Sequence, residues 1–314
     1  MNPVELKYSF IEMLTGSDLS KRRLPVMVAK SKKKGPVLWL TGCMHGDEIG
    51  GTVVIHEVFK KIRKYLKQGT VYALPLMNPS GFENMSRTIA ITREDLNRSF
   101  PGDKKGSLAQ RIAHKIFEAI VKTKPTLVVD LHNDWNKSIP YVLIDNGIKT
   151  TNSNVCDFAS ACGLLQVWDK DVLASSLTFN LIQKGIPALT LELGESWIIN
   201  EKNINSGVDV ILNLLKKMNM ITSGNMHPLS ATPSMFKHKK VHYFSLPLSS
   251  ASGIIRFNKK PGETVKKGER IARIYNAFGK TVETLTALED GLVLGHVDYA
   301  IAYPGAQVMA FGIG

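Results

Sequence analysis

The chain has 314 residues, of which 44% are hydrophobic, and a formal net charge of +13. This length can bury a substantial core and fits one large domain or two. An excess of Lys and Arg could serve nucleic acid, an anionic membrane surface or small acidic substrates. The basic runs, such as Lys32–Lys34, are short and lack the interleaved aromatic residues that stack on single-stranded nucleic acid. We therefore expect most of this charge to be a solvated surface, with no nucleic-acid partner.

The cysteines and the hydropathy pattern bear on the cellular compartment. The three cysteines, Cys43, Cys156 and Cys162, contain no CxxC pair, which argues against a disulfide framework and for a reducing compartment. The first residues lack the apolar core of a signal peptide, and no stretch approaches the roughly 18 apolar residues of a membrane helix. We expect a soluble, cytoplasmic protein without a membrane partner.

From Leu24 to about Met220, strand-like and helix-like patterns alternate along the chain. This alternation predicts an α/β fold with a mixed sheet, parallel at its centre and covered by helices on both faces. The strand-like runs are residues 24–29, 36–42, 70–78, 125–132, 141–145, 164–169 and 186–194. The helical patterns are residues 49–68, 107–122, 154–161, 175–184 and 204–220.

The composition changes after Met220. Residues 221–240 are rich in Ser, Thr, Pro and Gly, which is typical of a linker. Residues 241–314 have short strand patterns and turn signals but almost no helical periodicity. We therefore predict a larger α/β domain over residues 1–220, a linker over 221–240 and a small all-β domain over 241–314.

The stretch "LTGCMHGDEIGG", residues 40–51, places His45 and Glu48 between a buried strand and a helix. His132 directly follows another apolar strand, at the same expected edge of the sheet. A catalytic zinc site needs three protein ligands and an open position for water. His45, Glu48 and His132 are therefore candidate zinc ligands, although an HxxE pair by itself is more often a capped helix start with a solvated histidine.

Three neighbours of these residues have less direct roles. Asp130 shares a strand face with His132 and is a candidate for orienting its imidazole, because side chains two apart on a strand point the same way. Cys43 is a conceivable soft ligand, but a cysteine at a strand end is more often a small buried hydrophobic residue. Asp47 is expected to act as an acid at the helix start.

Two further blocks concentrate polar residues. Residues 78–103 follow a strand, lack periodicity and carry Arg87, Arg93, Asn97 and Arg98. A loop of this length is usually functional or disordered. The alternative interpretation is a long basic loop on the surface. Glu192 lies inside the apolar run 186–193, where a carboxylate is costly unless paired or used. A strand-borne acid that faces a metal is a natural general base, whereas the structural alternative is a buried salt bridge.

The motifs "GCMHGDEIGG", "NPSGFENMSRTIAITREDLNRSFPGD", "VVDLHND" and "LTLELGE" resemble, in this order, those of the succinylglutamate desuccinylase and aspartoacylase family. This family is the N-acyl amino acid deacylase branch of the zinc carboxypeptidase-like hydrolases. The resemblance extends from Leu24 to the C-terminus, because the family also has a small β domain after the catalytic one. In that segment "PGETVKKGE" and "EDGLVLG" resemble the half-repeats of biotinyl and lipoyl barrel sandwiches, but "NAFGKTVE" stands where those carriers have their Met-Lys turn.

The resemblance assigns roles to individual residues. It implies that His45, Glu48 and His132 hold one zinc ion per chain and that Glu192 is the general base. It further implies that Arg87 polarises the scissile carbonyl.

The same resemblance makes Asn97 and Arg98 the pair that binds a substrate carboxylate. The ten-residue interval from Arg87 to Asn97 is longer than in aspartoacylase itself and is similar to that of the broad bacterial deacylase branch. This leaves Arg93 as a competitor for the role of Arg87.

The expected function is hydrolysis of the amide bond of a small acidic N-acyl amino acid. The alternatives are a metallocarboxypeptidase that acts on small peptides and a non-enzymatic basic binding module. The β domain is expected to act as a lid that limits substrate size, with a remote stability or oligomerisation module as its alternative. The substrate's acyl group and amino acid stay open, as does assembly into a homo-oligomer.

Overall fold

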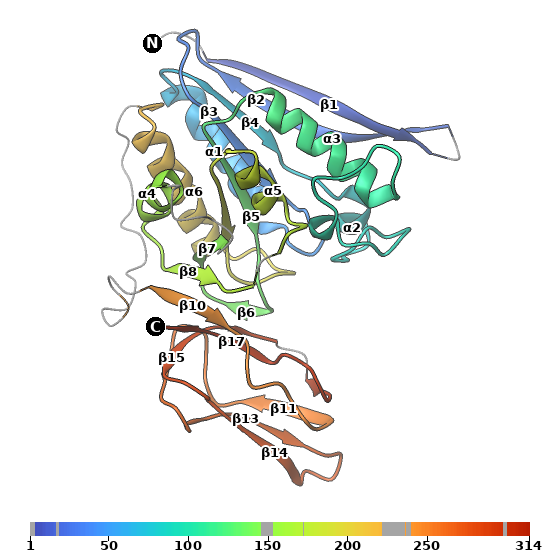
Figure 1. The fold of residues 1–314 in the computed structure, drawn as a ribbon, viewed down its shortest axis with the longest axis vertical. Coiled ribbons are helices and arrows are strands. Elements are labelled where there is room, and N and C mark those ends of the chain that lie inside the picture. The colour runs from blue at the N-terminus through green and yellow to red at the C-terminus, as the bar shows by residue number, and fades with distance from the viewer. Residues whose placement is uncertain are drawn as a thin grey trace.

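The computed structural model describes residues 4–16, 19–145, 153–171, 173–221, 236, 240–297 and 300–314. Its main feature is one long mixed sheet in which the strand order is β1-β2-β4-β3-β5-β9-β7-β8-β10-β17-β15-β12, with β6 paired to β15 (Figure 1). A second, four-stranded sheet has the order β14-β13-β11-β16. Most of the predicted linker, residues 222–235 and 237–239, lies outside the described residues.

The strands of the main sheet before the linker are β1 (Glu5–Thr15), β2 (Lys21–Lys30), β3 (Val37–Gly42), β4 (Thr70–Leu74), β5 (Leu127–His132), β6 (Lys137–Ser138), β7 (Tyr141–Asp145), β8 (Gln166–Asp169) and β9 (Ala188–Glu192). The helices are α1 (Gly50–Tyr65), α2 (Pro79–Glu83), the 3₁₀ turn η1 (Leu96–Arg98), α3 (Leu108–Lys122), α4 (Ser153–Cys162), α5 (Leu177–Gln183) and α6 (Glu201–Lys217). The later strands are β10 (Val241–Phe244), β11 (Gly253–Phe257), β12 (Thr264–Val265), β13 (Arg270–Tyr275), β14 (Thr281–Thr286), β15 (Gly291–His296), β16 (Ile301–Ala302) and β17 (Met309–Ile313).

The centre of the main sheet is parallel, as predicted. Strands β4, β3, β5 and β9 pair in parallel, whereas β7 joins β9 in antiparallel orientation. Every residue of β5 is buried, which is expected of a parallel strand that is covered on both faces. The predicted fold class is therefore confirmed.

Helices cover both faces of this sheet, and the side chains of β3 show which helix lies on which face. Gly42 approaches α1, where an added Cβ would lie 3.0 Å from the carbonyl carbon of Gly51. The indole of Trp39, which alternation places on the opposite face, donates a hydrogen bond to Thr123 at the end of α3, at 2.7 Å. Helix α6 packs against α1, and α4 packs against α6. Helix α5 lies on the same face as α3, because Thr178 of α5 contacts Thr190 on the α3 face of β9.

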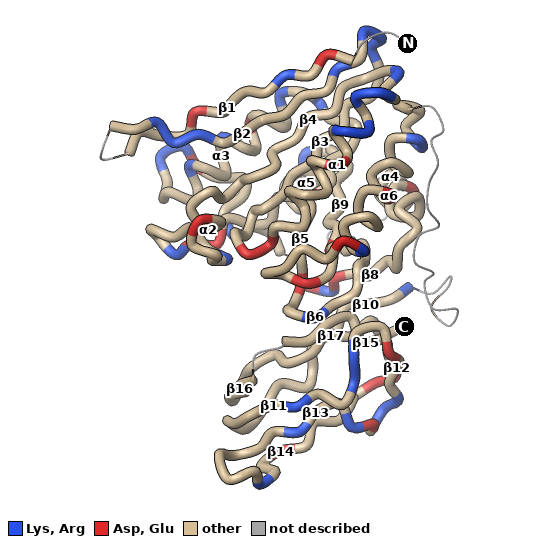
Figure 2. Tube along the Cα trace, turned by 180° about the vertical axis from the view of Figure 1, so that it is seen from behind, with Lys and Arg blue, Asp and Glu red and all other residues tan. Residues whose placement is uncertain are grey.

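The N-terminal strand β1 is not among the predicted strands. It forms an antiparallel hairpin with β2 at the edge of the sheet, and it carries apolar side chains on both faces, so its sequence shows no clear period of two. Tyr8 and Phe10 on this strand are exposed. Figure 2 shows Lys and Arg residues along this hairpin. None of the helices in the described ranges has the length and apolarity that spanning a membrane requires.

The C-terminal segment continues the main sheet. Val241 and His242 of β10 pair in parallel with Val167 and Trp168 of β8, and β17 and β15 follow β10. The four-stranded sheet packs over these strands around a core of its own that includes Ile271 and Ile274. Backbone hydrogen bonds therefore join the segment to the α/β part, while the predicted domain boundaries stay a prediction.

Candidate metal centre

The loop between β3 and α1 carries the first two candidate ligands. It is held by backbone hydrogen bonds from Glu48 N–H to the His45 carbonyl, at 3.1 Å, and from Gly46 N–H to the Ser86 carbonyl, at 3.0 Å. A Cβ at Gly46 would lie 1.9 Å from the carbonyl carbon of Gly81, so only glycine lets this loop approach α2 so closely. The loop thereby holds both side chains at the carboxyl end of the parallel strands.

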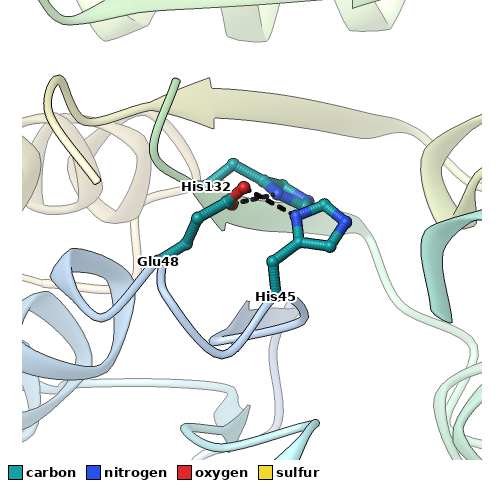
Figure 3. Close-up of side chains that lie close together, drawn as sticks. All are labelled: His45, Glu48 and His132. Carbon is teal, nitrogen blue, oxygen red and sulfur yellow. Dashed lines mark hydrogen bonds and ion pairs between the residues drawn. The ribbon is translucent and has the colours of Figure 1, made fainter. Parts of the chain in front are cut away.

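His45, Glu48 and His132 form a buried triad, and we use this name for the three residues below. One potential ligand atom from each lies within 4.8 Å of the others. Nδ1 of His45 is 2.7 Å from Oε1 of Glu48, and Nδ1 of His132 is 2.7 Å from Oε2 (Figure 3). The structure thus brings the three predicted ligands together.

The other ring nitrogen of each histidine faces a carboxylate. Nε2 of His132 is 2.9 Å from Oδ2 of Asp130, and Nε2 of His45 is 3.1 Å from Oδ1 of Asp95. Such partners hold a proton on Nε2 and leave Nδ1 to coordinate a metal. Two imidazole nitrogens and a carboxylate oxygen are the donor set of a catalytic zinc site, so these residues fit the predicted ion.

The charges around the triad also favour a cation. Burial opposes ionisation of Glu48, but His45 and His132 hold its pKa well below the usual value, so the carboxylate is charged. Burial likewise opposes the imidazolium form of His132, yet Asp130 and Glu48 raise its pKa well above the usual value. An environment that stabilises a proton between Nδ1 and a carboxylate also stabilises a metal ion there.

Asp95 connects the triad to the basic loop. Its carboxylate contacts His45 and accepts a hydrogen bond from Nε of Arg87 at 3.2 Å, and Arg98 lies 4.0 Å away. Burial alone would raise the pKa of Asp95, but the hydrogen bond to His45 and the nearby guanidinium groups hold it well below the usual value. The loop of residues 78–103 is therefore anchored at the site and is not a free surface loop.

Glu192 lies beside the triad at the end of β9, where it is the register neighbour of His132 on β5. Its side chain is buried, and Oε2 has no hydrogen-bond partner among the described residues. Burial, and then the charge of Asp134, raise the pKa of Glu192 well above the usual value. No described arginine or lysine forms a salt bridge with Glu192, so the structural alternative has no support here.

A cavity of about 220 Å³ opens beside the triad and Glu192. The predicted residues Arg87, Asn97 and Arg98 line this cavity, whereas Arg93 does not. Asn97 is held in place because its side-chain oxygen accepts a hydrogen bond from the Leu177 amide at 3.0 Å.

The structure agrees with the expectation for Cys43, a small buried residue, but not with the expectation for Asp47. Cys43 is buried, its Sγ contacts the His45 carbonyl oxygen at 3.4 Å, and burial raises the pKa of its thiol to about 12, which keeps it protonated. The expectation that Asp47 starts the helix is wrong, because α1 begins at Gly50 and has no acid in its first turn. The loop after β3 extends as far as Gly50, whose amide donates a hydrogen bond to Oδ1 of Asn133 at 3.1 Å.

Several residues of the site are not among those predicted. Asn133, Asp134 and Tyr141 line the cavity from β5 and β7, and Tyr243 reaches it from β10. The hydroxyl of Tyr243 accepts a hydrogen bond from the Trp135 indole at 3.1 Å. The sequence signal for Asn133 and Asp134 was their position directly after His132, but nothing local marks Tyr243, which arrives from the far side of the linker.

Comparison with known proteins identifies relatives. Residues 34–218, more than half of the chain, match the model of the succinylglutamate desuccinylase/aspartoacylase catalytic domain. N-alpha-acetyl-L-2,4-diaminobutyric acid deacetylase from Halomonas elongata is 36% identical over 110 residues, which are 35% of this chain and only 32% of that relative.

Solved structures share the fold. A succinylglutamate desuccinylase from a Silicibacter species has a TM-score of 0.84 at 19% identity, covering 100% of this chain and 99% of that one. A metallo-carboxypeptidase from Burkholderia cenocepacia has a TM-score of 0.55 at 14% identity, covering 68% of this chain and 64% of that one. With the family model, the triad and this fold, the chain belongs to the succinylglutamate desuccinylase/aspartoacylase family of metal-dependent deacylases.

Proposed function

We propose that this protein is a zinc-dependent deacylase that hydrolyses the amide bond of a small N-acyl amino acid. The observation that carries the proposal is the position of Glu192, a buried carboxyl with an unpaired oxygen, directly beside the His45–Glu48–His132 triad. A pure binding module has no need of a strand-borne base at a metal site. This argues against the non-enzymatic alternative.

His45 Nδ1, His132 Nδ1 and a Glu48 oxygen would hold the zinc ion. When bound there, zinc lowers the pKa of a coordinated water to about 7 and so supplies a nucleophile at neutral pH. Glu192 would accept a proton from the attacking water and later return it to the leaving amine. Burial raises the pKa of Glu192 well above the usual value, and a carboxyl that binds a proton more readily is better suited to accept one and pass it on.

Arg87 stabilises the charge that develops on the amide oxygen. Nη1 of its guanidinium is 3.2 Å from Oε1 of Glu48, and Nε is 3.2 Å from Oδ2 of Asp95, so the group is fixed beside the triad before substrate arrives. Preorganised donors of this kind act as an oxyanion hole. The absence of Arg93 from the cavity lining supports Arg87 over its competitor.

Arg98 and Asn97 bind the carboxylate of the substrate. The planar guanidinium of Arg98 matches a carboxylate as a fork, which lysine does not. Asn97 is positioned by its bond to the Leu177 amide and keeps its side-chain NH₂ for the ligand. Arg98 and Asn97 would thus hold the α-carboxylate of the small acidic substrate that the sequence predicts. The Halomonas relative supports the reaction class, because its name denotes the removal of an acetyl group from an α-amino group.

The experiment that tests the proposal is a screen of zinc-loaded protein against N-acetyl, N-succinyl and longer N-acyl amino acids, with release of free amine as the readout. We expect hydrolysis of at least one N-acyl amino acid that disappears when zinc is chelated and returns when zinc is restored. Hydrolysis of peptides in place of N-acyl amino acids would favour the carboxypeptidase alternative. A zinc-loaded protein that cleaves neither would contradict the proposal.

The remaining expectations from the sequence stay predictions. They are a cytoplasmic location, a surface that binds neither nucleic acid nor membrane, and the lid function of the C-terminal segment. The lid gains support from Tyr243, because this residue of β10 lines the cavity. Self-association into a homo-oligomer is open to measurement by light scattering.

A further inference from the structure

A second cavity lies between the tip of the β1–β2 hairpin, the loop of residues 78–103 and α3 (Figure 1). We call it the hairpin cavity, and its volume is about 490 Å³, within the range of roughly 300–1,000 Å³ that small-molecule sites occupy. The same loop contributes to the cavity beside the triad, but none of the described residues lines both. The proposed deacylase chemistry therefore does not use the hairpin cavity.

The wall of the hairpin cavity is mostly apolar, as the walls of ligand sites usually are. Buried and half-buried apolar side chains from all three elements line it, among them Met13, Leu14, Leu24, Met77, Ile89 and Ile112. Ile91 also lines it and is 77% exposed. Water is a poor partner for such a surface, so an apolar chain is favoured as its occupant.

One polar side chain in this wall is incomplete. Asn78 lines the cavity and is 2% exposed, and its Oδ1 accepts a hydrogen bond from the Gly81 amide at 2.9 Å. Its Nδ2 has no hydrogen-bond partner among the described residues. A buried donor without a partner is costly. This independent observation calls for an acceptor oxygen on the occupant.

The charges that line the hairpin cavity favour an anion. Arg22, Arg23 and a single acid, Glu83, belong to its lining, so the net charge is positive. Nη2 of Arg23 is 3.9 Å from Oε1 of Glu12, whereas Nζ of Lys21 is 2.9 Å from the same oxygen. Glu12 thus keeps its closer partner when Arg23 turns to a ligand. A negatively charged head group is complementary to this site.

We propose that the hairpin cavity binds a medium-chain aliphatic carboxylate. The carboxylate accepts a hydrogen bond from Nδ2 of Asn78 and pairs with Arg23, while the aliphatic chain packs on the apolar wall. A neutral chain would leave Asn78 without an acceptor, and a short acid would leave the wall exposed to water. The inference is independent of the proposed deacylase function, because the two cavities have different linings.

Matched ligands test the chemical class of the occupant. Sodium octanoate and 1-octanol have the same chain with and without the charged head, and sodium butyrate keeps the head but shortens the chain. In calorimetric titration of the full chain we expect octanoate to bind at least about tenfold more tightly than either, because it alone combines the charge-assisted hydrogen bonds with the full apolar contact.

Two results of this titration would overturn the proposal. One is the absence of saturable octanoate binding at millimolar concentrations. The other is equal or tighter binding of 1-octanol, which would indicate a purely apolar occupant such as a segment of a second copy of the chain.

Variants assign the binding to named side chains. Arg23→Gln removes the cation, and Asn78→Asp keeps an oxygen that accepts the Gly81 amide but replaces the NH₂ donor. Each should raise the Kd for octanoate by about tenfold. Arg63→Gln and Asn205→Asp are the matched controls, because they make the same changes at exposed positions outside the hairpin cavity. A wild-type Kd in both cavity variants, with an unchanged circular dichroism spectrum, would contradict the assignment.

A last control separates the two cavities, because Arg98 beside the triad is proposed to bind a carboxylate as well. Arg98→Gln should leave the Kd for octanoate at the wild-type value. Loss of octanoate binding in Arg98→Gln but not in Arg23→Gln would place the ligand beside the triad and refute the proposal. The titration involves no turnover, so octanoate binding that passes these controls stands even when no N-acyl amino acid is cleaved, an outcome that would count only against the deacylase.

Discussion

The two ends of the cavity contrast in how their charges are paired. At the triad end the three metal-ligand candidates are all paired: Glu48 contacts two histidines, and each histidine is backed by an aspartate. At the opposite end Asp145 and Asp169 lie side by side with no described basic partner. The first arrangement fixes the positions of the ligand atoms before a metal binds.

The two ends also differ in how they are built. The triad end is formed by the loop that follows β3 and by the last residue of β5, with Asp95 and Arg87 supplied by one long loop. At the other end, Asp145 and Asp169 are neighbours because β7 pairs with β8.

The largest effect should follow from breaking the triad. His132→Ala removes one of three ligands, and we expect zinc content to fall to the background and activity with it, because two side chains rarely hold a catalytic zinc. Metal analysis of the purified variant measures this. His56→Ala, at an exposed position of α1, is the matched control and should keep both its zinc content and its activity. Full zinc occupancy in His132→Ala would contradict the assignment of the triad.

The next effect separates chemistry from metal binding at the same end. Glu192→Gln keeps the shape of the side chain but cannot take a proton, so turnover should fall by about 10²- to 10⁴-fold while zinc is retained. Zinc content and kcat are measured on the same sample, with the exposed Glu201→Gln as control. If zinc were lost in step with activity, Glu192 would be a ligand and the triad description would need revision.

A smaller effect tests the aspartates that back the histidines. Asp95→Asn weakens the contact that holds the His45 ring and removes the anchor of Arg87, and we expect zinc affinity or activity to fall by about 10- to 100-fold. Competition with a chelator measures the affinity. Asp103→Asn, exposed on the same loop, should be indistinguishable from wild type. An unaltered zinc affinity and kcat/KM in Asp95→Asn would show that the loop does not contribute to the metal end.

The contrast between the two ends also explains what the sequence could predict. The triad and Glu192 lie in short motifs at the ends of apolar strands, so periodicity and strand-end position were enough to bring them to one edge of a parallel sheet. The fold class and the family were predicted from the same strands and motifs, and both are confirmed.

The other features depend on contacts that leave no local pattern. Asp145 and Asp169 become neighbours only because β7 pairs with β8, and Asp95 reaches His45 across 50 residues of chain. The strand β1 escaped prediction because an edge hairpin with apolar residues on both faces lacks alternation. Asp47 was misplaced because the start of α1 is set by Asn133, from another strand.

The smallest effect concerns Tyr243, the residue through which the C-terminal segment reaches the cavity. Tyr243→Phe removes the hydroxyl that accepts the hydrogen bond of the partly buried Trp135 indole, and the loss of such a hydrogen bond costs about 1 kcal/mol. We expect a lower free energy of unfolding in denaturant titration, with zinc content unchanged because the triad lies on other strands. Tyr303→Phe, exposed in the same segment, is the control and should leave stability at the wild-type value. If Tyr243→Phe matched this control in both stability and kcat/KM, β10 would be a passive neighbour of the cavity, and the lid function would lose its support.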